Sequence, residues 1–174
     1  IKASEKYIEL LEVSSDGGEL RIEMDEKRFK KPWNIEVYIN FREFSKLRIE
    51  GAVDLECDNV IKTDNLKLEF EGAGNVELNI EASKVIADIS GVGNFEIRGN
   101  TEYHKVSFDG IGNYEAQNLY SKFTLVESNG IGSVSVYASD KLKGEASGIG
   151  SIDYFGDPDD VDLEASGLGS VNGH

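Results

Sequence analysis

Three glutamates recur at a fixed interval in the middle of the chain, and they are the residues best spaced to bind a cation. Glu77, Glu96 and Glu115 follow one another at intervals of 19 residues. Like charges on neighbouring strands repel each other unless a cation such as Ca²⁺, or a basic partner, lies beside them. Water screens the same repulsion, so a solvated acidic face also explains the pattern. We favour the acidic face and predict no metal site, with these glutamates as candidate ligands if one exists.

A second acidic group, in the stretch DPDDVDLE, has the composition of a calcium loop. Asp157, Asp159 and Asp160 are further candidate ligands there. Their spacing departs from the EF-hand pattern, and no glycine stands where the sharp turn of that loop falls. The two acids that follow alternate with apolar residues and should point outward from a strand. We predict no metal at this segment either.

Catalytic arrangements find little support in the sequence. Of the two histidines, His104 falls in an inward apolar column and His174 is the last residue. Cys57 is the single cysteine and aligns with Leu78 and Ile97 of later repeats, which is typical of a buried structural thiol. No Ser/His/Asp or Cys/His arrangement can be assembled, and paired catalytic carboxylates would have to converge in a cleft. We therefore predict no catalytic and no cofactor-binding residue.

Pairs of glycines separated by one residue occur six times and could cradle a phosphate. A phosphate site needs a P-loop lysine or a strand–GxGxxG–helix unit, and no copy continues to a third glycine or into a helical pattern. Counted from a worn copy at Gly51, the intervals between first glycines are 21, 19, 19, 20, 18 and 19 residues. This regularity favours structural corners in a repeat protein. The corner glycines are Gly72, Gly74, Gly91, Gly93, Gly110, Gly112, Gly130, Gly132, Gly148, Gly150, Gly167 and Gly169.

The residues around each glycine pair alternate in the manner of half-buried strands. Apolar residues stand six, four and two places before the first glycine, and four and six places after it. The residue between the glycines is apolar as well, and we expect it to point inward, so that Ile111, Ile131 and Ile149 stack in the interior. Each repeat is then two short strands joined at a glycine corner.

One copy departs from this alternation, and one column suggests a polar ladder. Before Gly130, Phe123 and Leu125 come one place early, so we predict a β-bulge near Val126 and Glu127. Asparagine follows the second glycine in three successive repeats and serine follows it in the next three. Stacked amides can bond from strand to strand, so we interpret this column as structural.

Strands that recur every 19 residues without helices predict an all-β fold, a right-handed parallel β-helix (solenoid) of six to seven coils over residues 46–174. One coil cannot bury enough apolar surface to fold alone, so stacking makes the domain. Residues 1–45 differ, and we expect an antiparallel cap there within one structural domain overall. Asp16-Gly17-Gly18 predicts a hairpin, residues 33–41 a further strand, and Trp33 and Phe29 a cover for the open end of the stack.

Charge and composition exclude several classes of protein. With 33 acidic and 18 basic residues the net charge is −15, which argues against nucleic acid and anionic lipid as partners. No apolar run is long enough to span a bilayer. The chain begins at Ile1, so we expect a processed product whose signal peptide or lipid-anchoring cysteine would lie upstream.

The repeats resemble those of the head GIN domain family, bacterial proteins similar to autotransporter adhesins. The resemblance covers roughly residues 20–172, and a valine replaces the second glycine of the first copy. It is carried by RIEGAVDLE, FEGAGNVEL, ISGVGNFEI, FDGIGNYEA, NGIGSVSVY, ASGIGSIDYFGDPDDV and ASGLGSV. It implies a β-helical domain of an exported protein, held in the periplasm or at the cell surface, with adhesion as the role.

Two functions stay open at this point. The first is a non-enzymatic, adhesin-like module that binds a protein or glycan of the cell envelope through an extended flank of the solenoid, as a monomer or an oligomer. The alternative is a β-helical polysaccharide-active enzyme, a lyase or hydrolase, which would need a groove lined by convergent acids and basic residues.

Overall fold

The computed structural model describes the whole chain except residues 3–7, 25–34 and 167. The chain forms two compact units, Ile1–Arg42 and Glu43–His174. The strands are β1 Leu11–Asp16, β2 Glu19–Met24, β3 Lys46–Ala52, β4 Leu55–Ala73, β5 Val76–Phe108, β6 Ile111–Ala116, β7 Leu119–Ser128, β8 Ile131–Tyr137, β9 Lys141–Ala146, β10 Ile149–Phe155, β11 Asp160–Ala165 and β12 Leu168–Gly173.

The first unit contains the predicted hairpin. Strands β1 and β2 pair antiparallel, and the two-residue turn between them is Gly17-Gly18 with φ values of 58° and 84°. Two positive φ angles in a two-residue loop match the right-handed twist of the paired strands, and glycine adopts them without strain. The predicted strand over residues 33–41 is wrong, because in its described part only Glu36 pairs, in an isolated antiparallel bridge with Lys2. Trp33 and Phe29 lie outside the described residues, and their covering role stays a prediction.

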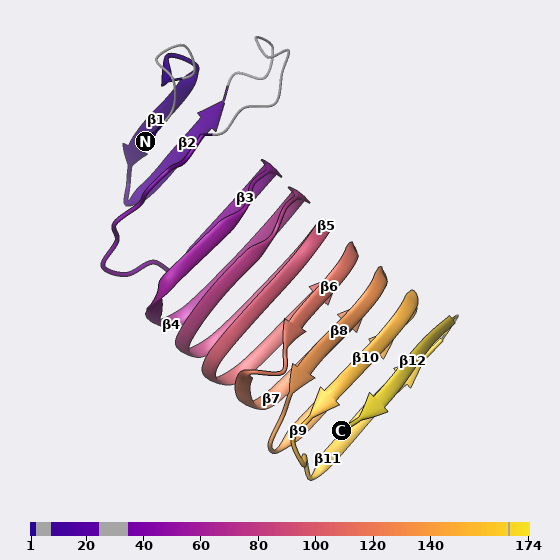
Figure 1. Cartoon of the computed structure of the whole chain (residues 1–174). Helices are drawn as coiled ribbons and strands as arrows, with labels where there is room; N and C mark the ends of the chain where they lie inside the picture. The colour runs from indigo at the N-terminus through magenta and orange to yellow at the C-terminus, as the bar shows by residue number, and fades with distance from the viewer. Residues whose placement is uncertain (3–7, 25–34, 167) are drawn as a thin grey trace. The chain divides into compact units, whose positions relative to one another are not determined.

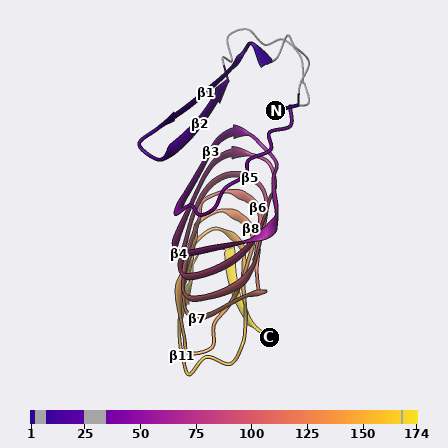
Figure 2. The same ribbon diagram turned by 90° about the vertical axis from the view of Figure 1, so that its left-hand side faces the viewer.

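The second unit is the predicted parallel β-solenoid, with about seven turns at a spacing of about 19 residues. Every strand from β3 to β12 pairs parallel with its neighbours (Figure 1). Strands β7, β9 and β11 form one face, and β6, β8, β10 and β12 form the other. The long strands β4 and β5 pass through the corners and contribute to both faces. In Figure 2 successive coils lie over one another as nested loops.

The inward columns of the two faces meet in one continuous core. Phe70 and Phe108 come from one face and Phe95 from the other, and the ring of Phe95 packs edge-on against both, at centroid distances of 4.8 and 6.4 Å. The predicted inward positions of the central coils are buried, with Leu66, Val76 and many others almost fully covered. Each such side chain stabilises the stack by roughly 1.5–3 kcal/mol.

The core thins out in the last coil, where β11 and β12 each pair on one side only. Val161, predicted to face inward, is 44% exposed, and Leu163 and Val171 are half-buried. The described chain places no further coil over this end, so inward positions there have partners on one side alone.

The predicted β-bulge near Val126 and Glu127 is wrong. The pairing of β5 with β7 keeps one offset from Gly99 to Phe108 without a shift. Thr124 and Ser128 occupy the inward positions, and Phe123 is 43% exposed. The inward hydroxyl of Thr124 donates to the carbonyl oxygen of Tyr137 at 2.6 Å, which satisfies it inside the stack.

The extra residue of this repeat lies in a turn instead. Glu96 pairs with Glu115, an offset of 19, whereas Gly99 pairs with Leu119, an offset of 20. The turn between β6 and β7 therefore absorbs the insertion, on the side of the coil opposite the glycine corner.

Candidate binding surface along the glycine corner

The glycine corner joins the two faces of each coil and brings consecutive backbones close together. Gly112 and Gly132 have φ values of 132° and 137°, a region that residues with a side chain rarely adopt. A Cβ atom at Gly132 would also overlap the carbonyl oxygen of Gly112 on the preceding coil. The corner therefore needs glycine for its backbone conformation and for its close approach.

The residue between the two glycines points outward, contrary to the prediction. Val92, Ile111, Ile131 and Ile149 are 51%, 52%, 48% and 53% exposed, and Leu168 is 76% exposed. They do stack in register from coil to coil, but on the exterior. We call the column of Ala52, Ala73, Val92, Ile111, Ile131, Ile149 and Leu168 the aliphatic ladder.

The outward direction follows from the strand alternation itself. Residues two before and four after the first glycine are inward, so an even offset faces the core and an odd offset faces solvent. The residue after the first glycine has an odd offset. Its apolar side chain suggested burial, whereas its odd offset from the first glycine correctly indicates that it faces solvent.

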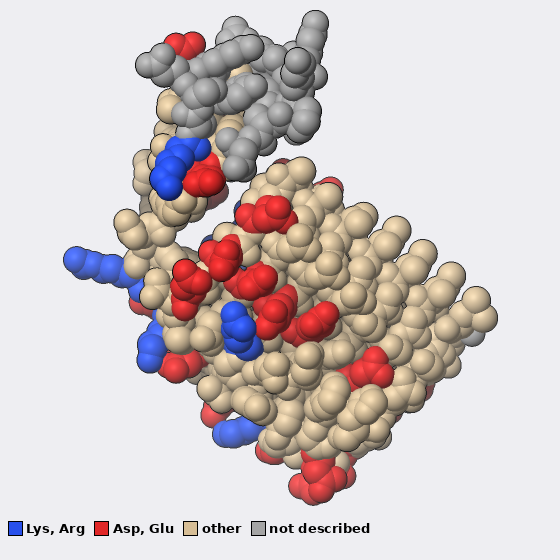
Figure 3. Space-filling view, viewed as in Figure 1, with Lys and Arg blue, Asp and Glu red and all other residues tan. Residues whose placement is uncertain are grey.

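The aliphatic ladder is rigidly supported by the backbone. The amide of Ile131 donates to the carbonyl of Gly110 at 2.8 Å, and the amide of Ile149 to that of Gly130 at 3.0 Å. Successive members lie about 4.8 Å apart, so seven span roughly 29 Å. In Figure 3 the edge of the solenoid where β8, β10 and β12 begin is almost free of charged residues.

Two ladders of polar side chains border the aliphatic ladder. On one side the predicted amide ladder is confirmed, since Asn113 Nδ2 donates to Asn94 Oδ1 at 3.2 Å and Asn94 Nδ2 to Asn75 Oδ1 at 3.3 Å. On the other side Asn129 Nδ2 donates to Asp109 Oδ1 at 2.9 Å. These bonds run along the stack and fix the side chains, so the corner presents a pre-ordered surface.

The candidate metal ligands do not converge. Glu96 and Glu115 stack in register as predicted, and Arg98 pairs with Glu96 at 3.1 Å. Among the residues that the structure describes, no three His, Cys, Asp or Glu side chains come close enough to share a metal ion. Glu77 lies in register with Glu56 of the preceding coil.

The DPDD segment lies in the turn between β10 and β11 and at the start of β11. Asp157 and Asp159 are exposed, and Asp160 forms an ion pair with Lys141. Lys143 pairs with Asp162 at 2.7 Å. Lysines on one coil thus face acids on the next coil, and local sequence motifs did not predict these ion pairs.

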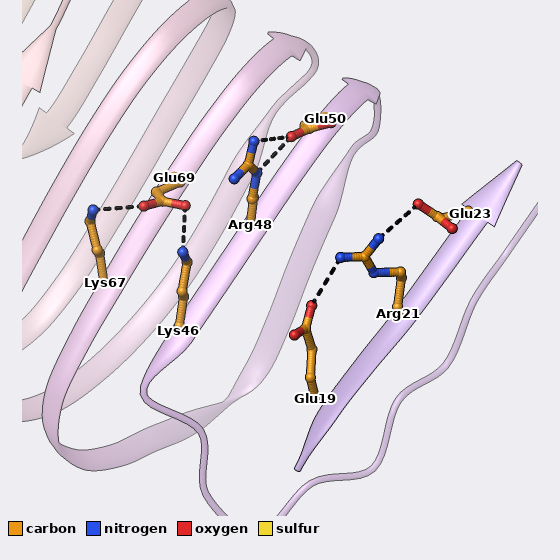
Figure 4. Close-up of polar contacts among 8 residues, drawn as sticks. All are labelled: Glu19, Arg21, Glu23, Lys46, Arg48, Glu50, Lys67 and Glu69. Carbon is orange, nitrogen blue, oxygen red and sulfur yellow. Dashed lines mark hydrogen bonds and ion pairs between the residues drawn. The ribbon is translucent and has the colours of Figure 1, made fainter. Parts of the chain in front are cut away.

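A hollow lined by residues of β3, β4 and β5 contains four acidic residues. Glu69, Glu71, Asp88 and Asp109 line it together with Arg48. Lys67 and Lys46 bond Glu69 at 2.6 and 2.9 Å and lower its pKa to about 2, so this group is a carboxylate that cannot donate a proton near neutral pH (Figure 4). A glycosidase needs one protonated acid beside one carboxylate, and Glu69 is unsuited to the first role.

The surroundings of His104 are those of a structural core residue. It is fully covered, and its Nε2 lies 2.8 Å from the hydroxyl of Tyr114, whose ring stacks on the imidazole. Burial lowers the pKa of His104 to about 3, so the ring is neutral. Cys57 is half-buried against the core, and its thiol contacts the carbonyl of Asn59.

Solved structures share this fold. A "putative adhesin" from Bacteroides fragilis superposes with a TM-score of 0.86 at 24% identity, covering 98% of this chain and 79% of its own. A "putative lipid binding protein" from Parabacteroides distasonis gives a TM-score of 0.74 at 22% identity, covering 99% of this chain and 82% of its own. No curated protein matches the sequence significantly.

No helix in the described part of the chain is long and apolar enough to cross a membrane. A family profile described as "Putative auto-transporter adhesin, head GIN domain" matches residues 1–158, nearly the whole chain. The glycine-corner repeats and the profile agree, and the chain belongs to the head GIN domain family of autotransporter-adhesin-like proteins.

Proposed function

We propose that the protein is a non-enzymatic, exported adhesin-like module that binds a protein or glycan of the cell envelope through the flank that carries the aliphatic ladder. One observation carries this proposal: five aliphatic side chains, from Val92 to Leu168, stand about half exposed or more in a single register column. Soluble proteins seldom expose contiguous apolar patches without a binding role. The family description, "Putative auto-transporter adhesin, head GIN domain", supports an adhesin-like role.

The energetics of the ladder suit weak, repeated attachment. Full burial of a Val or Ile is worth roughly 1.5–3 kcal/mol, so covering the exposed half of Val92, Ile111, Ile131 and Ile149 gains about 3–6 kcal/mol in total. Association costs at least about 4 kcal/mol in lost translation and rotation. A single contact is therefore weak, and many copies on one surface would gain strength through avidity.

The proposal is tested with a ladder variant, I111T/I131T/I149T. Threonine keeps the β-branched shape that strands favour while removing apolar surface. Binding to a glycan array and to envelope proteins should fall in this variant and persist in Val60→Thr, which changes an outward aliphatic residue outside the ladder. Equal binding by the ladder variant, or release of product from any polysaccharide, would overturn the proposal.

A further inference from the structure

We infer that the partner which fits the aliphatic ladder is a basic amphipathic helix, with an aliphatic stripe bordered on both sides by Lys or Arg. This inference rests on the proposed function, because it names the partner of the same surface. Three features of the corner carry it: the backbone pairing, the charge on either side and the length of the ladder.

The backbone at the corner offers few free N–H and C=O groups to an added strand. The amides of Ile131 and Ile149 already bond the preceding coil, and the strands on either side pair in parallel along the stack. A partner lying along the ladder therefore meets side chains instead of a row of free backbone groups. An α-helix satisfies its own backbone and binds through a side-chain stripe, so it suits this surface better than an extended peptide.

Acidic columns lie beyond both polar borders. Glu115 stands four residues after Ile111 on one face, in register with Glu96. On the other face Glu145 stands four residues before Ile149, in register with Glu127 and Glu164. Four residues of strand span about 13 Å, and the long lysine side chains on the two flanks of a helix that lies along the ladder extend toward the two columns.

Several of these acids are available to a partner. Arg98 pairs with Glu96 and Lys105 with Glu127, whereas Glu77, Glu115 and Glu145 form no ion pair within the described part of the chain. A second copy of this chain, docked ladder to ladder, would bring acidic columns against acidic columns. An anionic membrane would be repelled in the same way, so the charge favours a cationic partner.

The length of the ladder matches a helix of moderate size. Its seven members span roughly 29 Å, and an 18-residue helix is about 27 Å long. Side chains at i, i+3, i+4 and i+7 of such a helix form one apolar stripe, and the flanking positions point to either side, where the acidic columns lie.

The test uses a defined probe, an 18-residue Leu/Lys peptide with leucine at helical spacing and lysine at the flanking positions. A counterpart carries glutamate in place of every lysine, and phosphatidylcholine vesicles represent an uncharged lipid surface. Binding is measured by fluorescence anisotropy at low and high salt, and self-association by analytical ultracentrifugation. The proteins are the wild type, I111T/I131T/I149T, E77Q/E115Q/E145Q and the control Val60→Thr.

We expect the Lys peptide to bind the wild type and Val60→Thr alike. Affinity should fall about tenfold or more in the ladder variant, since three aliphatic contacts are lost. It should fall severalfold in the glutamine variant, together with the salt dependence, because the charge contacts are lost. The Glu peptide should not bind.

The inference is overturned if the ladder variant binds the Lys peptide as well as the wild type does, since attraction would then be purely ionic. It is also overturned if the wild type ignores the peptide but binds the vesicles, or associates with itself through the ladder. Ladder-dependent binding to a glycan or another protein, without peptide binding, would leave the proposed function standing and refute only the helix. If no binding of any kind depends on the ladder, both fail.

Discussion

Acidification should destabilise the solenoid through a single buried histidine. His104 is fully covered, and among the described residues its Nδ1 has no hydrogen-bond partner, so a proton on Nδ1 would have no acceptor. Burial lowers its pKa from 6.5 to about 3. The unfolded chain therefore takes up a proton as the pH falls below 6.5, while the folded chain does not. The stability is present above pH 6.5 and is lost as the pH falls from there toward 3.

The magnitude follows from the width of that window. Each pH unit between the two pKa values changes the free energy of unfolding by about 1.4 kcal/mol for one proton. Between pH 7.5 and 4.5 the loss from His104 alone is about 3 kcal/mol, because the pKa of the unfolded histidine lies two units above the lower limit. For a domain of this size the loss is a substantial part of the total stability.

The assay is urea unfolding followed by circular dichroism at pH 7.5, 6.5, 5.5 and 4.5 and constant ionic strength. The reference is the double variant His104→Leu/Tyr114→Phe, which removes both partners of the buried hydrogen bond and keeps the volume similar. Carboxylates titrate alike in both proteins, so the difference between them isolates the histidine. Parallel stability curves for the two proteins would refute the reasoning.

Three further predictions concern the corner and its borders. Gly132→Ala should lower the free energy of unfolding by about 3–5 kcal/mol in urea unfolding, because the backbone is strained and the new Cβ overlaps the preceding coil. Gly51 has a φ of 98° but open space around it, so Gly51→Ala should lower it by only about 1–2 kcal/mol. Equal losses in the two variants would contradict the close-approach argument. Asn94→Ala removes a donor and an acceptor from the amide ladder and should cost about 1–2 kcal/mol, and an unchanged melting temperature would mean that the ladder bonds add nothing over water. The variant E77Q/E96Q/E115Q should be as stable as the wild type or slightly more stable, and millimolar calcium should leave the melting temperature of both unchanged; a calcium-dependent rise in the wild type alone would reveal a cation site.

The fold could be predicted from the sequence because repetition exposes it. Each coil repeats the same inward columns, so one pattern is seen seven times, and the period, the parallel pairing and the amide ladder are confirmed. Stacking in a solenoid is set by nearest neighbours, which an alignment of repeats reproduces directly.

The errors arose where residue type and position disagreed. Ile131 is apolar but stands at an outward position, and Thr124 is polar but faces inward, where it bonds the carbonyl of Tyr137. Judged by residue type alone, Ile131 was predicted to face inward and Thr124 to face outward. The first error placed the aliphatic ladder in the interior, and the second led to the predicted β-bulge. The ion pairs between coils, such as Lys143 with Asp162, depend on side-chain reach across the stack, which no motif encodes. The DPDD acids do not gather into a metal site, because Asp157 and Asp159 are exposed to solvent and Asp160 pairs with Lys141.

The glycine corner keeps the coils in register even though their lengths differ. Coils of 18, 19 and 20 residues occur, yet Ile111, Ile131 and Ile149 remain partners, because residues are gained and lost at the opposite turns, as between Ala116 and Leu119. Insertions at those turns should leave the spacing of the exposed column untouched. Whole coils could therefore be duplicated or deleted, or foreign loops grafted onto the opposite turns, without changing this spacing. Successive side chains of the aliphatic ladder would still lie about 4.8 Å apart.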